Sequence, residues 1–281
     1  MEIYKIHGRL TDEITGEIAH NKNLISLDIE LENAYMDMDQ LKYILTHNKN
    51  ISTLDISNNN IDKYVLDGLV DGMTRNEYMS ILNMSSTSLS YQNSAALSHV
   101  ISYSKSLKNL ILDDNHLDDR GLRLLSTSIY KSKLEHVSLK NIGITEHSIK
   151  YISNIIKHNN TIRYLDVRSR FMGCYIEFRH LKPLRYNHTI TTLLTNRLVV
   201  IDDQIKTIIE FNRLYQAHVI KDIFKNILYF DVIFNIVGFV SLLDDLWMKL
   251  NLNTTPEQIL NNKENYCKFI NFINKSDIRS N

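Results

Sequence analysis

The segment from Ile51 to Ile61, ISTLDISNNNI, decides the fold of this chain. Counted from Ile51, apolar residues occupy positions one, four and six, and Asn59 stands at position nine before the apolar Ile61. This spacing predicts a short strand that buries alternate residues and then turns sharply, where the Asn59 amide can bond backbone groups that the turn leaves open. Strand and turn recur along most of the chain.

Seven segments in all follow this pattern, at intervals of 27 or 28 residues. Their first positions are Leu24, Ile51, Met79, Leu107, Leu134, Ile162 and Ile190. Positions four and six are apolar in the first six segments, whereas Thr195 replaces the apolar sixth residue in the last. The turn asparagine is present as Asn59 and Asn115, and Thr87 and Ile142 replace it elsewhere. So regular a period indicates a repeat architecture.

Between the predicted strands, the apolar residues change to a helical spacing of three and four. The apolar stripes are Leu41, Ile44 and Leu45; Leu66, Leu69, Val70 and Met73; Leu97, Val100 and Ile101; Leu122, Leu125 and Ile129; Ile149, Ile152 and Ile156; and Ile205, Ile208 and Ile209. Each unit is therefore predicted to be a strand, a turn and a helix, and each buries its apolar face only by stacking on its neighbours.

The pattern resembles the leucine-rich repeat, LxxLxLxxNxL, and the unit length with a full helix resembles the ribonuclease-inhibitor subtype of that family. The resemblance covers residues 1–216 and is specific for fold, not for function. It implies an α/β fold, a right-handed solenoid with a curved parallel sheet inside and helices outside. Residues before the first full repeat are predicted to form a short capping repeat, in which Ile3, Ile6 and Leu10 make a truncated strand and turn and Thr11 caps a helix.

Residues 217–281 leave the period and are predicted to form an all-α C-terminal cap of three helices, the last beginning with a capping box at Thr255. The stretch from Ile223 to Leu243 is apolar enough to suggest a membrane span as the alternative. Lys225 and Asp231 lie within it, and charges inside a span are costly. We therefore expect a helical cap over the last repeat and no membrane partner.

Composition narrows the class of protein. The formal net charge is zero, so no bulk attraction to nucleic acid is expected. The two cysteines, Cys174 and Cys267, lie far apart without CxxC partners, which indicates neither a disulfide framework nor a zinc site. The N-terminal residues lack the apolar run of a secretory signal peptide. We expect a monomeric, cytoplasmic protein, which would act in a host cytosol if it is a secreted effector.

Catalytic motifs are missing from the sequence. It contains neither GxxxxGK[ST] nor GxGxxG, and no HExxH. Adjacent acids such as Asp113 and Asp114 diverge around a helix or face opposite sides of a strand, so they make no acid–base pair. His136 and Tyr164 lie on predicted strands without a matching nucleophile. We therefore expect no enzymatic activity and no cofactor.

A second column of asparagines stands three residues before the repeats begin. Its members are Asn21, Asn48, Asn76, Asn159 and Asn187, with Ser104 and Lys131 in the other two units. His20, His47 and His158 precede three of them. We interpret each pair as a helix end, where Asn tolerates the left-handed conformation and His faces the C-terminal end of the helix dipole. The alternative is a metal-binding or pH-sensing histidine column.

Equivalent positions of successive strands form side-chain columns on the inner, concave face of the predicted sheet, because adjacent strands lie about 4.8 Å apart. Acidic residues precede basic ones along these columns, so the face is expected to be acidic in its first half and basic in its second. The alternative is that solvated polar residues are what any unliganded sheet face shows. The candidate partner-binding residues are Asp28, Glu30, Asp55, Asp113, Asp114, His136, Lys140, Arg163, Tyr164, Asp166, Arg168 and Arg197.

The resemblance implies a non-enzymatic scaffold that docks a protein partner of mixed charge on the concave face. Association should then slow as ionic strength rises. Precedents in the family include inhibitors, receptor sensor arrays and effectors of intracellular microbes or large viruses. Two alternatives on the same fold are a GTPase-activating protein and an adaptor whose C-terminal helices recruit a ubiquitin ligase. No residue here matches the functional residues of the GTPase-activating subgroup.

Overall fold

The computed structural model describes residues 2–31 and 38–170, together with 183–184, 187, 189–195 and 209. By internal contacts the chain divides into two units, Met1–Ile201 and Asp202–Asn281, and every strand and helix named below belongs to the first. The predicted C-terminal cap at residues 217–281, its alternative as a membrane span, and the candidate residue Arg197 lie outside the described residues. Within the described part, no helix is long and apolar enough to cross a bilayer.

Eight strands form one open, parallel sheet in which each strand pairs with its neighbours in chain order. They are β1 (Glu2–His7), β2 (Leu24–Glu30), β3 (Thr53–Asp55), β4 (Ile81–Asn83), β5 (Asn109–Ile111), β6 (His136–Ser138), β7 (Tyr164–Asp166) and β8 (Thr192–Leu194). The register places the predicted fourth positions side by side, from Leu27 on β2 to Leu193 on β8. The strand prediction is therefore confirmed in all seven repeats.

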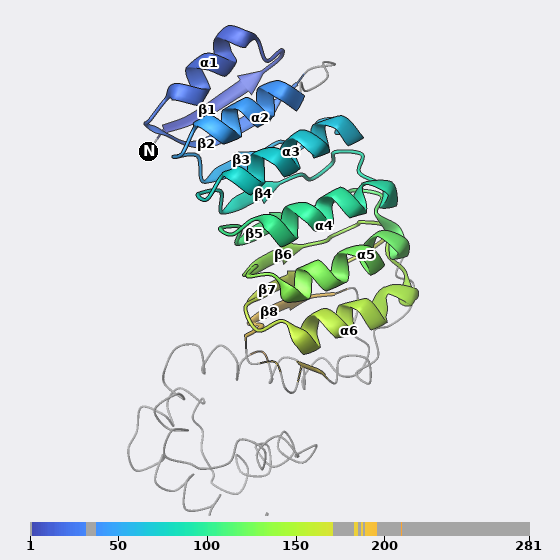
Figure 1. Ribbon diagram of the computed structural model, residues 1–281. Helices are drawn as coiled ribbons and strands as arrows, with labels where there is room; N and C mark the ends of the chain where they lie inside the picture. Colours follow the sequence, from blue (N-terminus) through green and yellow to red (C-terminus); the bar gives the residue numbers. More distant parts are fainter. Residues whose placement is uncertain are drawn as a thin grey trace, which may run out of the picture. The chain divides into compact units, whose positions relative to one another are not determined.

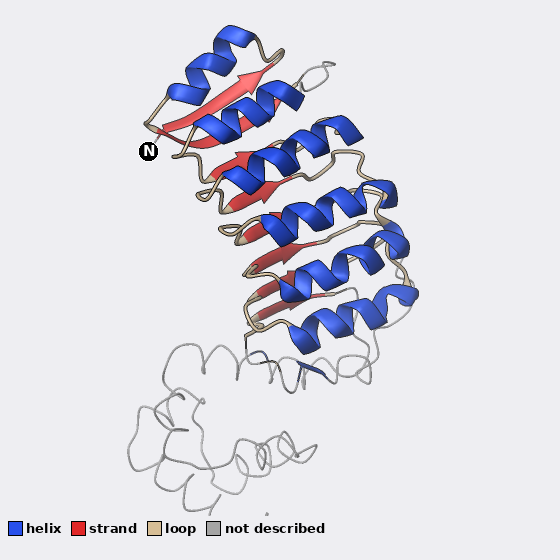
Figure 2. Ribbon diagram, in the orientation of Figure 1, coloured by secondary structure: helices blue, strands red, loops and turns tan. Residues whose placement is uncertain are grey.

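Helices alternate with the strands and form a second layer that covers one face of the sheet (Figures 1 and 2). They are α1 (Asp12–His20), α2 (Met38–His47), α3 (Lys63–Arg75), α4 (Ser94–Tyr103), α5 (Asp118–Lys131) and α6 (Ile149–His158), with 3-10 turns at Tyr91–Asn93 and Glu146–Ser148 before α4 and α6. Thr11 caps α1 as predicted, because its Oγ1 accepts the N–H of Ile14 at 3.3 Å. The other face of the sheet, turned away from the helices, is the concave face.

The core lies between the two layers. Positions four and six of each strand point toward the helices, so that Leu54, Ile56, Leu110 and Leu112 have no exposed surface. Five of the six predicted helical stripes are buried against them, with Val70 half-buried at the margin. The sixth stripe lies outside the described residues except for Ile209. Alternate apolar residues on strands and a stripe on each helix are thus enough to build one continuous core.

The N-terminal repeat differs from the prediction of a truncated strand. β1 has six residues and pairs with β2 along its whole length. Tyr4 and Ile6 stand opposite Leu27 and Ile29, so Ile3 falls on the concave face, where it is 62% exposed. The predicted truncation was wrong because the strand extends over six residues, and the alternation of the strand places Ile3 and the buried Ile6 on opposite faces.

The helix-end asparagines also differ from expectation, because they are not left-handed. Asn21, Asn76 and Asn159 are extended, with φ of −73°, −96° and −92°. Left-handed residues occur instead in the turns after the strands, among them position eight of four repeats, occupied by Asn58, Ser86, Asp114 and Asn141 with φ from 54° to 61°. The helix passes directly into the next strand, which requires an extended residue, and the sharp reversal falls after the strand.

Candidate protein-binding face

A ladder of asparagines fixes the beginning of the strands, and we call it the helix-end ladder. Asn48 shows how it works: its Nδ2 donates to the carbonyl oxygens of Ile18 and Asn21 in the preceding repeat, at 2.7 and 2.9 Å. Its Oδ1 accepts the N–H groups of Asn50 and Ile51 at 2.9 and 3.2 Å. The ladder comprises Asn48, Asn76, Asn159 and Asn187, which all make these two kinds of bond.

A second ladder fixes the turn that follows the strands. Asn59 Nδ2 donates to the carbonyl of Ile29 in the preceding repeat at 2.7 Å, and Asn115 Nδ2 donates to that of Met84 at 2.8 Å. Where Thr87 replaces the asparagine, its Oγ1 reaches the same Met84 carbonyl at 2.7 Å. The predicted role of the turn asparagine is confirmed. Asparagines of the two ladders thus tie the beginning or the end of several strands to the preceding unit, whereas Lys131 and Ile142 occupy both positions in the repeat of β6.

In the first half of the concave face, two of the predicted acids lie beside basic side chains of β1. Lys5 Nζ is 2.9 Å from Asp28, and His7 Nδ1 is 3.5 Å from Glu30. The hydrogen bond to Asp28 raises the pKa of Lys5. Asp55 accepts bonds from neutral groups, the hydroxyl of Ser57 among them, at 2.6 Å. Sequence reasoning missed both contacts because it treated the first strand as truncated, and Lys5 partly offsets the charge of the predicted acidic half.

In the middle of the face, the acids accept hydrogen bonds from the next repeat. Asp113 Oδ1 accepts the hydroxyl of Ser138 at 2.6 Å and the backbone N–H of Lys140 at 3.0 Å. Asp114 accepts the side-chain amide of Asn141 at 3.0 Å. Asp113 and Asp114 therefore connect repeats, as well as carrying charge.

The predicted basic half contains an internal ion pair. Arg168 Nη2 lies 2.6 Å from Asp166 Oδ2, and Arg168 Nε lies 3.0 Å from Asp166 Oδ1. Asp166 is only 1% exposed, and its hydrogen bond raises the pKa of Arg168. Arg168 thus neutralises the buried carboxylate of Asp166. The two residues are positions five and seven of their repeat, and this spacing in the sequence does not reveal that they form an ion pair.

Arg163 and Arg168 do not form one patch. Arg163 precedes β7 and Arg168 follows it, so that five residues of extended chain, about 16 Å, separate their backbones. Lys140 lies beside Arg168, since the N–H of Asn141 bonds the carbonyl of Arg168 at 2.7 Å. Arg163 lies instead at the edge of the sheet where the strands begin, and its side chain is exposed.

His136 and Tyr164 lie side by side on β6 and β7 and form a stacked pair. Their ring centroids are 4.0 Å apart and the ring planes differ by 4°. Both residues are half-buried. Burial lowers the pKa of His136, although the nearby carboxylates of Asp113 and Asp166 act in the opposite direction. A neutral imidazole stacked on a phenol gives a flat, rigid aromatic surface at the centre of the second half. Both residues were predicted to be site residues, but their stacking was not.

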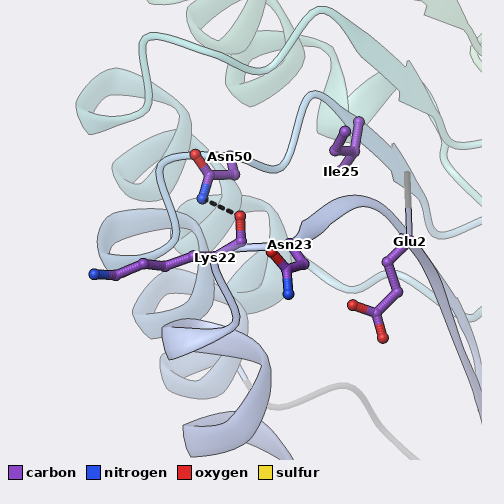
Figure 3. Close-up of a pocket in the computed structure, with 5 residues that line it drawn as sticks. All are labelled: Glu2, Lys22, Asn23, Ile25 and Asn50. Carbon is purple, nitrogen blue, oxygen red and sulfur yellow. Dashed lines mark hydrogen bonds between the residues drawn. The ribbon is translucent and has the colours of Figure 1, made fainter.

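A hollow near the beginning of β1 and β2 is a further candidate site. This shallow hollow of about 550 Å³ is lined by Glu2, Lys22, Asn23, Ile25 and Asn50, where Lys22 and Glu2 point to opposite sides of Asn23 (Figure 3). The described residues contain no group of three or more His, Cys, Asp or Glu that could hold a metal ion.

Two of the three histidines before the helix-end asparagines contact helix-end carbonyls, as the dipole interpretation predicts. His20 and His47 each place Nδ1 at 2.8 and 2.9 Å from the carbonyl oxygen four residues earlier, on Gly16 and Tyr43 respectively. They therefore satisfy carbonyl groups near the ends of α1 and α2.

Comparison with known proteins gives partial matches. No family model matches the chain. A segment of 81 residues is 33% identical to NACHT, LRR and PYD domains-containing protein 3 of Mus musculus, covering 28% of this chain and 8% of that protein. A segment of 113 residues is 27% identical to ribonuclease inhibitor of Mus musculus, covering 40% of this chain and 24% of that protein. The matches thus span a quarter or less of these curated relatives.

Among solved structures, actin-binding site 2 of leiomodin-1 superposes with a TM-score of 0.45 at 15% identity, covering 66% of this chain and 94% of that chain. The C-terminal domain of tropomodulin from Caenorhabditis elegans gives a TM-score of 0.39 at 12% identity, covering 67% and 99%.

Sequence and structure agree on the repeat. Units of 27 or 28 residues align in register, each strand of the open parallel sheet pairs with the next, and the asparagine ladders follow the same period. The sequence matches fall on proteins of the same repeat type. In its fold and its repeats, this chain is similar to leucine-rich repeat proteins such as ribonuclease inhibitor.

Proposed function

We propose that this protein is a non-enzymatic scaffold that binds a protein partner through the concave face. The observation that carries the proposal is the stacked pair of His136 and Tyr164, which lies half-exposed on the neighbouring strands β6 and β7 of the parallel sheet. A rigid aromatic surface loses little conformational entropy on binding, and aromatic residues are enriched in interface hot spots.

The groups around the stacked pair suit a partner of mixed character. Lys140 adds a cation on the neighbouring turn, and the carboxylates of Asp113 and Asp166 lie close enough to act on the His136 ring. A partner would cover the stack with an apolar or aromatic side chain and place an acidic group near Lys140. Support from relatives is limited to the name of ribonuclease inhibitor, a protein that acts on another protein, because only 40% of this chain aligns with it.

The test uses affinity capture with three forms of the protein: the wild type, a double variant of the stacked pair and a matched control variant. Calorimetry then measures the binding free energy of each recovered partner with each form. The double variant His136→Ala/Tyr164→Ala should weaken binding by about 2 kcal/mol or more, as expected for hot-spot residues. The matched control, Ser26→Ala/Thr53→Ala, changes the same column of the face far from the stack and should leave binding unchanged. Partners that bind the aromatic double variant as tightly as the wild type would rule out the stack as the site.

Charge reversal is better made at Lys140 than at Arg168. An acid at position 168 would face the buried carboxylate of Asp166 and disturb the fold itself. Lys140→Glu should slow association with the same partner and reduce its dependence on ionic strength. An unchanged association rate would remove Lys140 from the interface.

We further propose that the scaffold acts in the cytosol, either of its own cell or, as a secreted effector, of a host. Imaging of a fluorescent fusion in both settings would check this prediction. Fluorescence confined to a membrane or to the exterior would contradict it.

A further inference from the structure

The exposed charges are sorted across the sheet, from one end of the strands to the other. We define the basic edge as the six segments in which a helix ends and a strand begins: residues 20–25, 47–52, 75–80, 103–108, 130–135 and 157–163. Its cations are Lys22, Lys49, Arg75, Lys105, Lys108, Lys131, Lys133, Lys157 and Arg163, whereas its only acids are Glu77 and Glu135.

The opposite edge, where strands end and helices begin, has an excess of acids. They are Asp12, Glu13, Glu30, Asp39, Asp62, Asp113, Asp114, Asp118, Asp119 and Glu146. Cations are interspersed there, and several are paired, such as Arg120 with Asp118 at 2.6 Å. A chain of zero net charge therefore has a polarity across its repeats, which differs from the lengthwise polarity that the sequence suggested.

Helix dipoles account for only part of the basic edge. Cations in the last helical turn, such as Arg75, Lys131 and Lys157, stabilise the helix C-terminus. That stabilisation fades beyond the last turn. Lys22 and Lys133 lie past the ends of their helices, so the helix dipole does not explain them.

Ion pairs with the acids of the basic edge do not neutralise all of its cations either. Both of its acids are paired, Glu77 with Lys105 at 3.0 Å and Glu135 with Lys108 at 2.8 Å. The cations that make no ion pair with a described residue are Lys22, Lys49, Arg75, Lys131, Lys133, Lys157 and Arg163, and all of them are exposed. Two tyrosines of the same segments are exposed as well, Tyr78 by 54% and Tyr103 by 59%.

We propose that the basic edge is a second docking surface, which binds an acidic, extended segment of a partner protein. Six strand ends at about 4.8 Å spacing span at least about 24 Å, which roughly eight residues of extended peptide can cover. Acids at alternate residues recur about every 6.6 Å, so that about four of them face this span, and Tyr78 and Tyr103 supply apolar contact. Duplex nucleic acid carries a charge about every 1.7 Å, far denser than the one or two cations per repeat. An acidic polypeptide is therefore the better match.

The test measures binding of a labelled synthetic peptide of about twelve residues, alternating Glu and Ser, to the full chain by fluorescence anisotropy. Lys22→Glu/Lys131→Glu/Lys133→Glu changes the basic edge. Arg9→Glu/Arg123→Glu/Lys150→Glu removes three exposed cations elsewhere and matches the change in net charge. The basic-edge variant should bind the peptide at least about tenfold more weakly, and the matched variant less than about twofold more weakly.

Equal losses in the two variants would overturn the proposal, because net charge alone would then explain binding. Tighter binding of a single-stranded RNA of equal charge would also overturn it and would assign the edge to nucleic acid. The concave-face variant His136→Ala/Tyr164→Ala should bind the peptide like the wild type, so this proposal and the proposed function succeed or fail separately.

Discussion

At the scale of single residues, one asparagine of the helix-end ladder satisfies four backbone groups. Asn76 donates to the carbonyls of Leu45 and Asn48 and accepts the N–H groups of Tyr78 and Met79. These four groups lie where a helix ends and a strand begins, so neither element can satisfy them by itself. Asparagine has both a donor and an acceptor at the right reach, whereas serine has a shorter side chain.

Ser104 interrupts this ladder, and replacing it with asparagine should stabilise the protein. Its Oγ is buried without a hydrogen-bond partner among the described residues. By the period of the repeat, an amide there would reach the carbonyls of Met73 and Asn76. Ser104→Asn should raise the free energy of unfolding by about 1 kcal/mol, measured by urea denaturation. The reverse change, Asn76→Ser, should lower it; a loss of stability in both variants would contradict the ladder mechanism.

His136 should make stability depend on pH. Its pKa is lowered in the folded state by burial, so in the window between that value and the ordinary value of about 6.5 the unfolded chain binds more protons. This contribution to stability is complete above about pH 6.5 and is lost as the pH falls. His136→Phe keeps an aromatic ring on Tyr164 but cannot titrate. Between about pH 7.5 and about pH 5, the melting temperature of the variant should therefore fall less steeply with decreasing pH than that of the wild type. Equal falls in the two proteins would contradict the prediction.

At the scale of elements, a glycine allows two neighbouring helices to pack closely. A Cβ added to Gly72 on α3 would lie 2.8 Å from the Cβ and Cδ1 atoms of Leu45 on α2. Glycine is unfavourable in a helix, so its presence here is explained by the space it leaves for Leu45. Helix α2 can therefore approach α3 closely at this point, in line with the fully buried Leu45 side chain.

Gly72→Ala should consequently destabilise the protein by about 1–3 kcal/mol, because overpacking outweighs the better helix propensity of alanine. Gly16 in α1 provides the control: nothing lies within 4 Å of a Cβ added there. Gly16→Ala should raise stability by about 0.5–1 kcal/mol. Both changes can be read from the midpoint of thermal unfolding, and a stabilised Gly72→Ala variant would show that α2 and α3 are not tightly packed.

The strands and helices could be predicted from the sequence, because apolar residues recur at every second position in the strands and at every third or fourth position in the helices. These residues are buried between the two layers, which stabilises both kinds of element. Turn and cap geometry was harder. The left-handed residue was expected at Asn76 and its equivalents, but it lies at Ser86 and its equivalents, where the residue type varies among Asn, Ser and Asp. The stack of His136 on Tyr164 and the pairing of Arg168 with Asp166 depend on χ angles, which residue spacing does not specify.

At the scale of the whole molecule, stability comes from neighbour contacts that extend through all described repeats. Leu110 is fully buried on β5 and stands in register between Leu82 and Val137. Leu110→Asp should lower the free energy of unfolding by more than about 3 kcal/mol, since it leaves an unpaired carboxylate in the core. The next residue, Ile111, is half-exposed on the concave face and provides a matched control.

Ile111→Asp should cost much less than Leu110→Asp. Hydrogen exchange should show protection lost first around β5 in the Leu110 variant and spreading to the adjoining repeats. Equal effects of the two substitutions would contradict the register. The register sets the candidate residues of the columns on neighbouring strands, whereas Arg163 and Arg168 are separated by the length of a strand.

The two asparagine ladders have a consequence for the gene. The bonds that link the repeats are donated by asparagine amides to carbonyls of the immediately preceding repeat, about 28 residues earlier. Recombination that deleted or duplicated one full period would therefore rejoin donor to acceptor without disturbing the flanking units. The number of repeats, and with it the length of both the concave face and the basic edge, can change in a single genetic step, while a change of any other length would leave the ladders without partners.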